Sequence, residues 1–79
     1  METLDPIDRE RINCKTLIMS KLIELRKQKG LSQQDLASMV GMKQPAIARL
    51  ENLKTTPTID TLIEVLYPLG YTLEVVPIK

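Results

Sequence analysis

Apolar side chains recur every three or four residues in four stretches of this chain, which is the spacing of helices that bury one face. We expect an all-α domain over residues 5–70, with four helices at about 6–29, 32–39, 44–51 and 58–69. Asp5 before Pro6 is typical of a helix start, and Gly30 of a helix end. Residues 1–4 precede that start, so we expect a flexible N-terminus.

The first and last helices carry the most apolar surface. The first has a stripe at Ile18, Leu22 and Leu25 for packing on the next helices, and more apolar residues at Ile7, Cys14, Leu17, Met19 and Ile23. One small domain can hardly bury all of them, so this helix is a dimer or partner surface, or its N-terminal part bends back. The fourth helix is expected to bury Ile59, Leu62, Ile63, Val65, Leu66 and Leu69.

The hydrophobic period changes after Gly70. Residues 71–77 alternate and are rich in β-forming side chains up to Pro77, which predicts a short C-terminal β-strand. A lone strand leaves its backbone groups without partners, and no other stretch predicts a strand. We expect it to pair, through Tyr71, Leu73 and Val75, with the same strand of a second copy across a two-fold axis. The alternative is an extended tail.

A fixed spacing of small and aliphatic residues marks the two central helices. Ala37 is small enough for a second helix to pass over it closely, and Gly41 can take the positive φ angle of a tight turn between helices. Ile47 and Leu50 follow at the spacing that buries one face of the second helix. Together they indicate a helix-turn-helix, whereas a plain helical hairpin would not need these four residues at these places.

This set of residues resembles the helix-turn-helix of phage-repressor and Cro-like regulators, the xenobiotic-response-element type. The resemblance extends from about Ile18 to Gly70. It implies a lambda-repressor-like fold whose third helix lies in the DNA major groove.

The resemblance implies which side chains of the third helix read bases. We expect Gln44, Pro45, Ala48 and Arg49 to face outward, with Lys43 available for a base or a phosphate. Gln44 can pair with an adenine edge and Arg49 with guanine O6 and N7. Pro45 stands where related repressors often have a polar side chain, so one direct base contact is replaced by an apolar one.

A second set corresponds to positions that hold the DNA backbone in the family. Gln33 begins the second helix, and the loop after the third helix supplies Asn52, Lys54, Thr55 and Thr56. Such contacts position a protein on DNA but read no sequence. The family commonly has glycine where this chain has Leu53, and we expect Asn52 to take the left-handed conformation instead.

Arg26 and Glu51 correspond to an arginine on the first helix and a glutamate at the end of the recognition helix. The resemblance implies a structural clamp that holds the reading helix. The alternative is two ordinary surface charges, which would contribute little.

Composition excludes several kinds of chemistry. The chain is 43% hydrophobic without Trp or Phe, so its core is aliphatic. It has no histidine and one cysteine, Cys14, which excludes an internal disulfide and argues against metal sites, cofactors and enzymatic acid–base catalysis. We expect Cys14 to be a buried or half-buried hydrophobe.

The net charge of +1 is low for a DNA-binding protein, but the charge is unevenly placed. Residues 11–30 carry six basic residues against Glu24, whereas both ends of the chain are acidic. This cluster could supply a phosphate-facing surface, although lysines on a solvated helix face are also ordinary.

The long first helix, the C-terminal strand and the lack of a separate ligand-binding domain most resemble the HigA- and HipB-like antitoxins. That group implies a cytoplasmic homodimer that represses its own promoter through a palindromic operator in double-stranded DNA and neutralises a cognate toxin. A stand-alone repressor or a restriction-modification controller shares these features, and a protein-interaction module without a DNA role is the alternative of another class. No apolar run is long enough for a membrane span.

Overall fold

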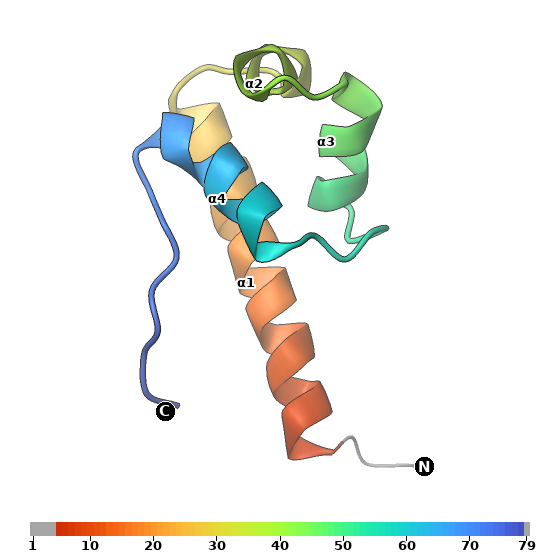
Figure 1. The fold of residues 1–79 in the computed structure, drawn as a ribbon, viewed down its shortest axis with the longest axis vertical. Coiled ribbons are helices and arrows are strands. Elements are labelled where there is room, and N and C mark those ends of the chain that lie inside the picture. Colours follow the sequence, from red (N-terminus) through yellow and green to blue (C-terminus); the bar gives the residue numbers. More distant parts are fainter. Residues whose placement is uncertain (1–4, 79) are drawn as a thin grey trace.

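The computed structural model describes residues 5–78 as four helices and a short terminal turn (Figure 1). The expected flexible segment 1–4 lies outside the described residues. Helix α1 spans Pro6–Gln28, α2 Gln33–Val40, α3 Gln44–Glu51 and α4 Ile59–Leu66, and a 3-10 turn, η1, covers Tyr67–Leu69. The fourth helix is therefore shorter than expected, because Pro68 has no N–H to continue it and the chain tightens into η1.

Side-chain caps begin the first two helices. The Asp5 carboxylate accepts a hydrogen bond from the Ile7 backbone N–H at 2.8 Å. At the start of α2, the Asp35 N–H donates to Ser32 Oγ at 3.0 Å, and the Ser32 N–H donates to Asp35 Oδ2 at 2.9 Å. This reciprocal pair satisfies two backbone donors that the helix leaves free, and hydrogen bonds from the Ser32 backbone and side chain lower the pKa of Asp35.

The turn between α2 and α3 depends on a glycine and an alanine. Gly41 ends α2 with φ 71°, in the left-handed region, and the Met42 N–H donates to the Ala37 carbonyl at 2.9 Å. Ala37 is fully buried. A side chain no larger than a methyl group there lets the two helices cross at short distance, and α3 leaves the turn in a different direction from α2 (Figure 1).

The core lies where the second half of α1 meets the three shorter helices. It is entirely aliphatic apart from Met19, and its fully buried side chains include Leu22, Leu36, Ile47, Val65 and Leu69. Ile18 packs against it half-buried. The first half of α1 projects away from this core, and Ile7, Ile12 and Leu17 on it are exposed.

Three sequence expectations about burial are wrong. Ile59 and Ile63 are exposed, because α4 turns only Leu62, Val65 and Leu66 toward the core; Ile59 and Ile63 lie one turn apart on another face. Cys14 is exposed too, on the projecting half of α1, where its thiol contacts Glu10 at 3.3 Å. That carboxylate raises the pKa of the Cys14 thiol.

The strand expected at 71–77 is not formed in the single chain. Residues 71–78 have no regular secondary structure, and none of the described residues belongs to a strand. Beyond η1 the tail turns back along α1 (Figure 1). Leu73 packs partly against the core, whereas Val75 is 99% exposed. The physical reason is the absence of a neighbouring strand, because a strand exists only through its hydrogen bonds to another.

Candidate nucleic-acid interface

The outer face of α3 collects the residues expected to read bases. Ile47 and Leu50 are buried, so helical geometry turns the intervening positions outward. Pro45 and Arg49 are exposed, Gln44 and Ala48 are half-buried, and Lys43 precedes the helix as an exposed N-cap residue. Pro45 lies in the first turn, where its missing N–H has no helical partner to lose. The expected reading residues therefore share one face.

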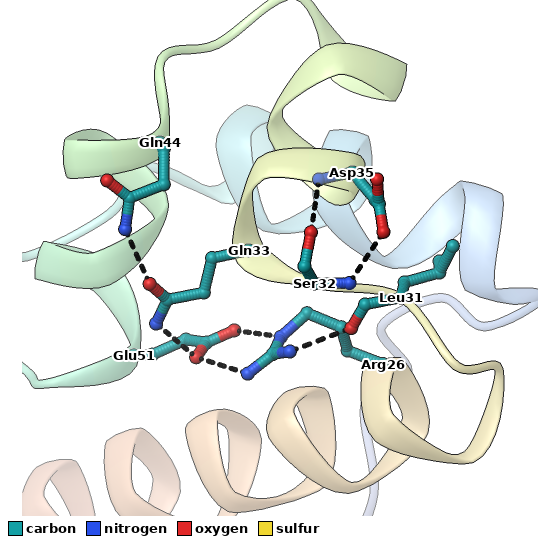
Figure 2. A network of polar contacts seen from close by, with 7 residues as sticks. All are labelled: Arg26, Leu31, Ser32, Gln33, Asp35, Gln44 and Glu51. Carbon is teal, nitrogen blue, oxygen red and sulfur yellow. Dashed lines mark hydrogen bonds and ion pairs between the residues drawn. The ribbon is translucent and has the colours of Figure 1, made fainter.

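Gln44 is held in place by a second glutamine. Its Nε2 donates to Gln33 Oε1 at 2.6 Å, and Gln33 Nε2 donates in turn to Glu51 Oε1 at 2.9 Å (Figure 2). A primary amide has two N–H donors and an acceptor oxygen. Gln44 thus keeps its oxygen and one N–H for a partner outside the protein, which is the pair that an adenine edge requires.

Arg26 and Glu51 form a buried ion pair rather than two surface charges. Arg26 Nε donates to Glu51 Oε2 at 2.7 Å, and Arg26 Nη2 donates to Glu51 Oε1 at 3.0 Å. The two side chains are only 9% and 3% exposed. Arg26 Nη1 also donates to the Leu31 carbonyl at 2.8 Å, so the guanidinium joins α1, the segment before α2, and α3 (Figure 2).

These contacts make one network that ends at the reading face. Glu51 Oε1 accepts hydrogen bonds from both Arg26 and Gln33, and Gln33 in turn accepts a hydrogen bond from Gln44 and so orients it. The resemblance implied a phosphate contact for Gln33 but did not predict its hydrogen bond with Gln44. The available signal was the pair itself: one glutamine in the first turn of each of the two helices.

The chain leaves α3 through a leucine in a strained conformation. Leu53, not Asn52, takes the left-handed region, with φ 57°, while Asn52 has φ −92°. The Lys54 N–H donates to the Arg49 carbonyl at 2.9 Å and the Leu53 N–H to the Leu50 carbonyl at 3.1 Å. This bonding closes a helix end that normally has glycine at the left-handed position, so the expectation for Asn52 is wrong.

The remaining backbone-contacting candidates follow directly on this turn. Lys54, Thr55 and Thr56 are all exposed, in the loop between α3 and α4. Gln33 lies in the first turn of α2. The candidate phosphate contacts thus come from the start of α2 and from the loop after α3, and contacts of this kind set the orientation of a helix on a duplex.

The chain matches a family model described as Helix-turn-helix over residues 22–76. The chain belongs to this helix-turn-helix family. A transcriptional regulator of this type from Haemophilus influenzae is 43% identical over 67 residues, which cover 85% of this chain and 68% of that protein. The regulator PuuR of Escherichia coli is 40% identical over 53 residues, which cover 67% of this chain but only 29% of PuuR.

A solved structure also resembles this helix-turn-helix regulator over nearly its whole length. A chain of a toxin-antitoxin module from Streptococcus pneumoniae is 45% identical, with a TM-score of 0.80 and coverage of 96% of this chain and 84% of that one. The regulator is thus a DNA-binding protein and not an enzyme. Within residues 5–78, no group of acidic or sulfur side chains could hold a metal ion, and no helix is long and apolar enough to cross a membrane.

Leu53 offers a direct test of the strained turn. A non-glycine residue in the left-handed region lowers the stability of the folded state by about 1–2 kcal/mol. Glycine avoids this strain, but its greater conformational freedom in the unfolded chain offsets part of the gain. We expect Leu53→Gly to raise the free energy of unfolding by about 0.5–1 kcal/mol in urea titrations. Leu53→Ala, which shortens the side chain but keeps the strain, should not stabilise the protein; an equal gain in both variants would contradict the prediction.

Proposed function

We propose that this regulator is a transcriptional repressor that reads its operator through the outer face of α3, acting on DNA in the cytoplasm. The network that fixes Gln44 is the observation that carries the proposal. A side chain held at 2.6 Å by Gln33, which is anchored on a buried ion pair, needs little further ordering when it meets a base. Arg49 is exposed on the same face and free to reach a guanine.

The decisive experiment is binding of the purified protein to DNA from upstream of its own gene. Fluorescence anisotropy at two salt concentrations, with a scrambled duplex as control, separates sequence reading from charge attraction. We expect tighter binding to the native sequence and a loss of affinity at higher salt. Equal affinity for both duplexes would contradict operator reading and favour a protein-interaction module instead.

We further propose that the regulator acts as a homodimer on a palindromic operator. Two α3 helices would then enter successive major grooves about 34 Å apart. The tail supports this proposal, because residues 72–78 make no backbone hydrogen bond within the described chain and Val75 is 99% exposed. The same segment of a second copy, antiparallel across a two-fold axis, would satisfy both copies equally through the edge that includes Tyr71, Leu73 and Val75.

Blocking that edge tests the dimer. Proline has no N–H to donate to a partner strand, so Val75→Pro should convert the dimer to a monomer in light scattering, whereas Val75→Ala should remain dimeric. Val75 is 99% exposed, so neither change disturbs the core. A dimer that survives Val75→Pro would place the interface elsewhere.

The toxin-antitoxin neighbour supports an antitoxin role within an autoregulated operon, with a cognate toxin as partner. The family model begins at residue 22, so it does not include the first half of α1. The Streptococcus pneumoniae chain covers 96% of this one and hence most of that half as well. Ile7, Ile12 and Leu17 leave an apolar surface there that the domain's own core does not use.

A neighbouring gene product provides the test. We expect the protein encoded beside this regulator to co-purify with it, and the uncharged change Ile12→Gln on the projecting half of α1 to weaken that complex without changing DNA affinity. Ile59→Gln, at an exposed position of α4, is the matched control. A stand-alone repressor would have no such partner.

A further inference from the structure

Helix α1 runs beside the loop that is proposed to hold the DNA backbone. Lys15, Ile18 and Met19 of α1 line one side of a crevice of about 80 Å³, and Leu53, Thr56 and Pro57 of the loop line the other. Met19 is buried, and Lys15 lies one helical turn before it on the same side of the helix. The side chain of Lys15 therefore leaves the helix next to the loop, at the outer end of the crevice.

Within residues 5–78, Lys15, like Arg9 and Lys27, has no acidic partner, whereas the three other basic residues of α1 do. Arg11 pairs with Asp8 at 2.6 Å, Lys21 pairs with Glu24 at 3.5 Å, and Arg26 is bound to Glu51. Among the described residues, Lys15 forms neither an ion pair nor a side-chain hydrogen bond, and it is exposed. Its ammonium group is thus available to an anion from outside the chain.

We propose that Lys15 binds a phosphate of duplex DNA and extends the backbone-holding surface from the α3–α4 loop onto α1. Its aliphatic stem lines the crevice opposite Leu53 and Pro57, so its charge can reach an anion held beside Thr56. Thr56 supplies a neutral hydroxyl, whereas the lysine adds the positive charge that displaces a counterion. Its contribution is independent of sequence, because a phosphate carries no base identity.

This proposal rests on operator binding by the proposed repressor, and the test uses the full chain with its operator duplex. Each phosphate neutralised by a base contributes about 0.9 to the slope of log affinity against log salt concentration. Lys15→Gln should therefore lower that slope by about 0.9 and weaken operator and scrambled duplexes by the same factor.

Lys21→Gln is the matched control. It removes the same charge from the same helix, but Lys21 lies on the side that faces the tail, where Leu66 and Leu73 line a separate groove. We expect its salt slope to stay at the wild-type value. Thermal unfolding of both variants should match the wild type, since both lysines are exposed.

The outcomes separate the two proposals. An unchanged slope in Lys15→Gln, with the wild type still preferring its operator, overturns the role of Lys15 and leaves the repressor intact. A loss confined to the operator, with the scrambled duplex unaffected, also overturns it, because that is the behaviour of a base contact. A wild type without preference for its operator overturns the repressor itself and this inference with it.

Discussion

Replacing Glu51 by alanine should lower the free energy of unfolding by about 3–5 kcal/mol, the largest effect of any single change at the interface. The reason is the arginine that stays behind. Arg26 is buried and directs Nε and Nη2 at the Glu51 carboxylate, so removing the acid leaves a buried positive charge without a counter-charge. Urea unfolding followed by circular dichroism measures the change.

An exposed ion pair on α1, the helix that also carries Arg26, provides the comparison. Arg11 and Asp8 lie 2.6 Å apart, about as close as Arg26 and Glu51, but both are exposed to solvent. Arg11→Ala should cost no more than about 1 kcal/mol, since water solvates whichever charge remains. If Glu51→Ala were as mild as Arg11→Ala, the Arg26–Glu51 pair would not be a buried support of α3.

A double variant tests whether the stability of the protein depends on the two charges themselves or only on their being paired. Arg26→Met with Glu51→Leu removes both ions together and leaves no buried charge unpaired. Such replacements of buried ion pairs are often neutral or stabilising. We expect the double variant to recover most of the stability lost in Glu51→Ala, while the hydrogen bond that Gln33 makes to Glu51 is lost with it. Weaker operator binding by a stable double variant would show that the network serves recognition.

Replacing Arg49 by alanine should weaken operator binding by about 1–3 kcal/mol and relax the preference at one base position. Arg49 is exposed on the reading face, where a guanidinium can donate two hydrogen bonds to one guanine. Anisotropy titrations against operators substituted one base pair at a time measure both effects. On a duplex already altered at the base pair that Arg49 contacts, Arg49→Ala and the wild type should bind with similar affinity.

Lys54→Ala is the control for this assignment. Lys54 is exposed in the loop after α3, and we propose that its ammonium group contacts a phosphate and not the edge of a nucleobase. Its loss should weaken all duplexes alike and reduce the salt slope by about 0.9. If Arg49→Ala and Lys54→Ala behaved identically, the division into reading and holding residues would be wrong.

The burial errors show where sequence patterns reach their limit. Ile59 and Ile63 fit a helical apolar stripe as well as Leu62 and Leu66 do, because periodicity reveals that a helix has an apolar face but not how wide a strip its neighbours cover. Helix α4 packs through only part of that surface. The projecting half of α1 shows the same limit, since Ile7 and Ile12 are exposed and do not belong to the core.

Leu53 shows a second limit, which concerns the backbone. The resemblance indicated that a left-handed residue is needed after α3, and Asn52 has the better intrinsic tolerance for it. The geometry of the helix end instead places the positive φ angle at Leu53. The hydrogen bonds from Leu53 and Lys54 back to Leu50 and Arg49 require the positive φ one residue later.

Local spacing along the chain was enough to predict the helix-turn-helix and its turn. The small Ala37, the left-handed Gly41 and the cap of Ser32 with Asp35 act through contacts within about one turn of chain, which local spacing encodes. The packing of the helices on one another sets three other features: the hydrogen bond between Gln33 and Gln44, the burial of Arg26 with Glu51, and the place of Lys15 beside the α3–α4 loop. These residues lie 11, 25 and about 40 positions apart, and no local pattern specifies the orientation of one helix on another that brings them together.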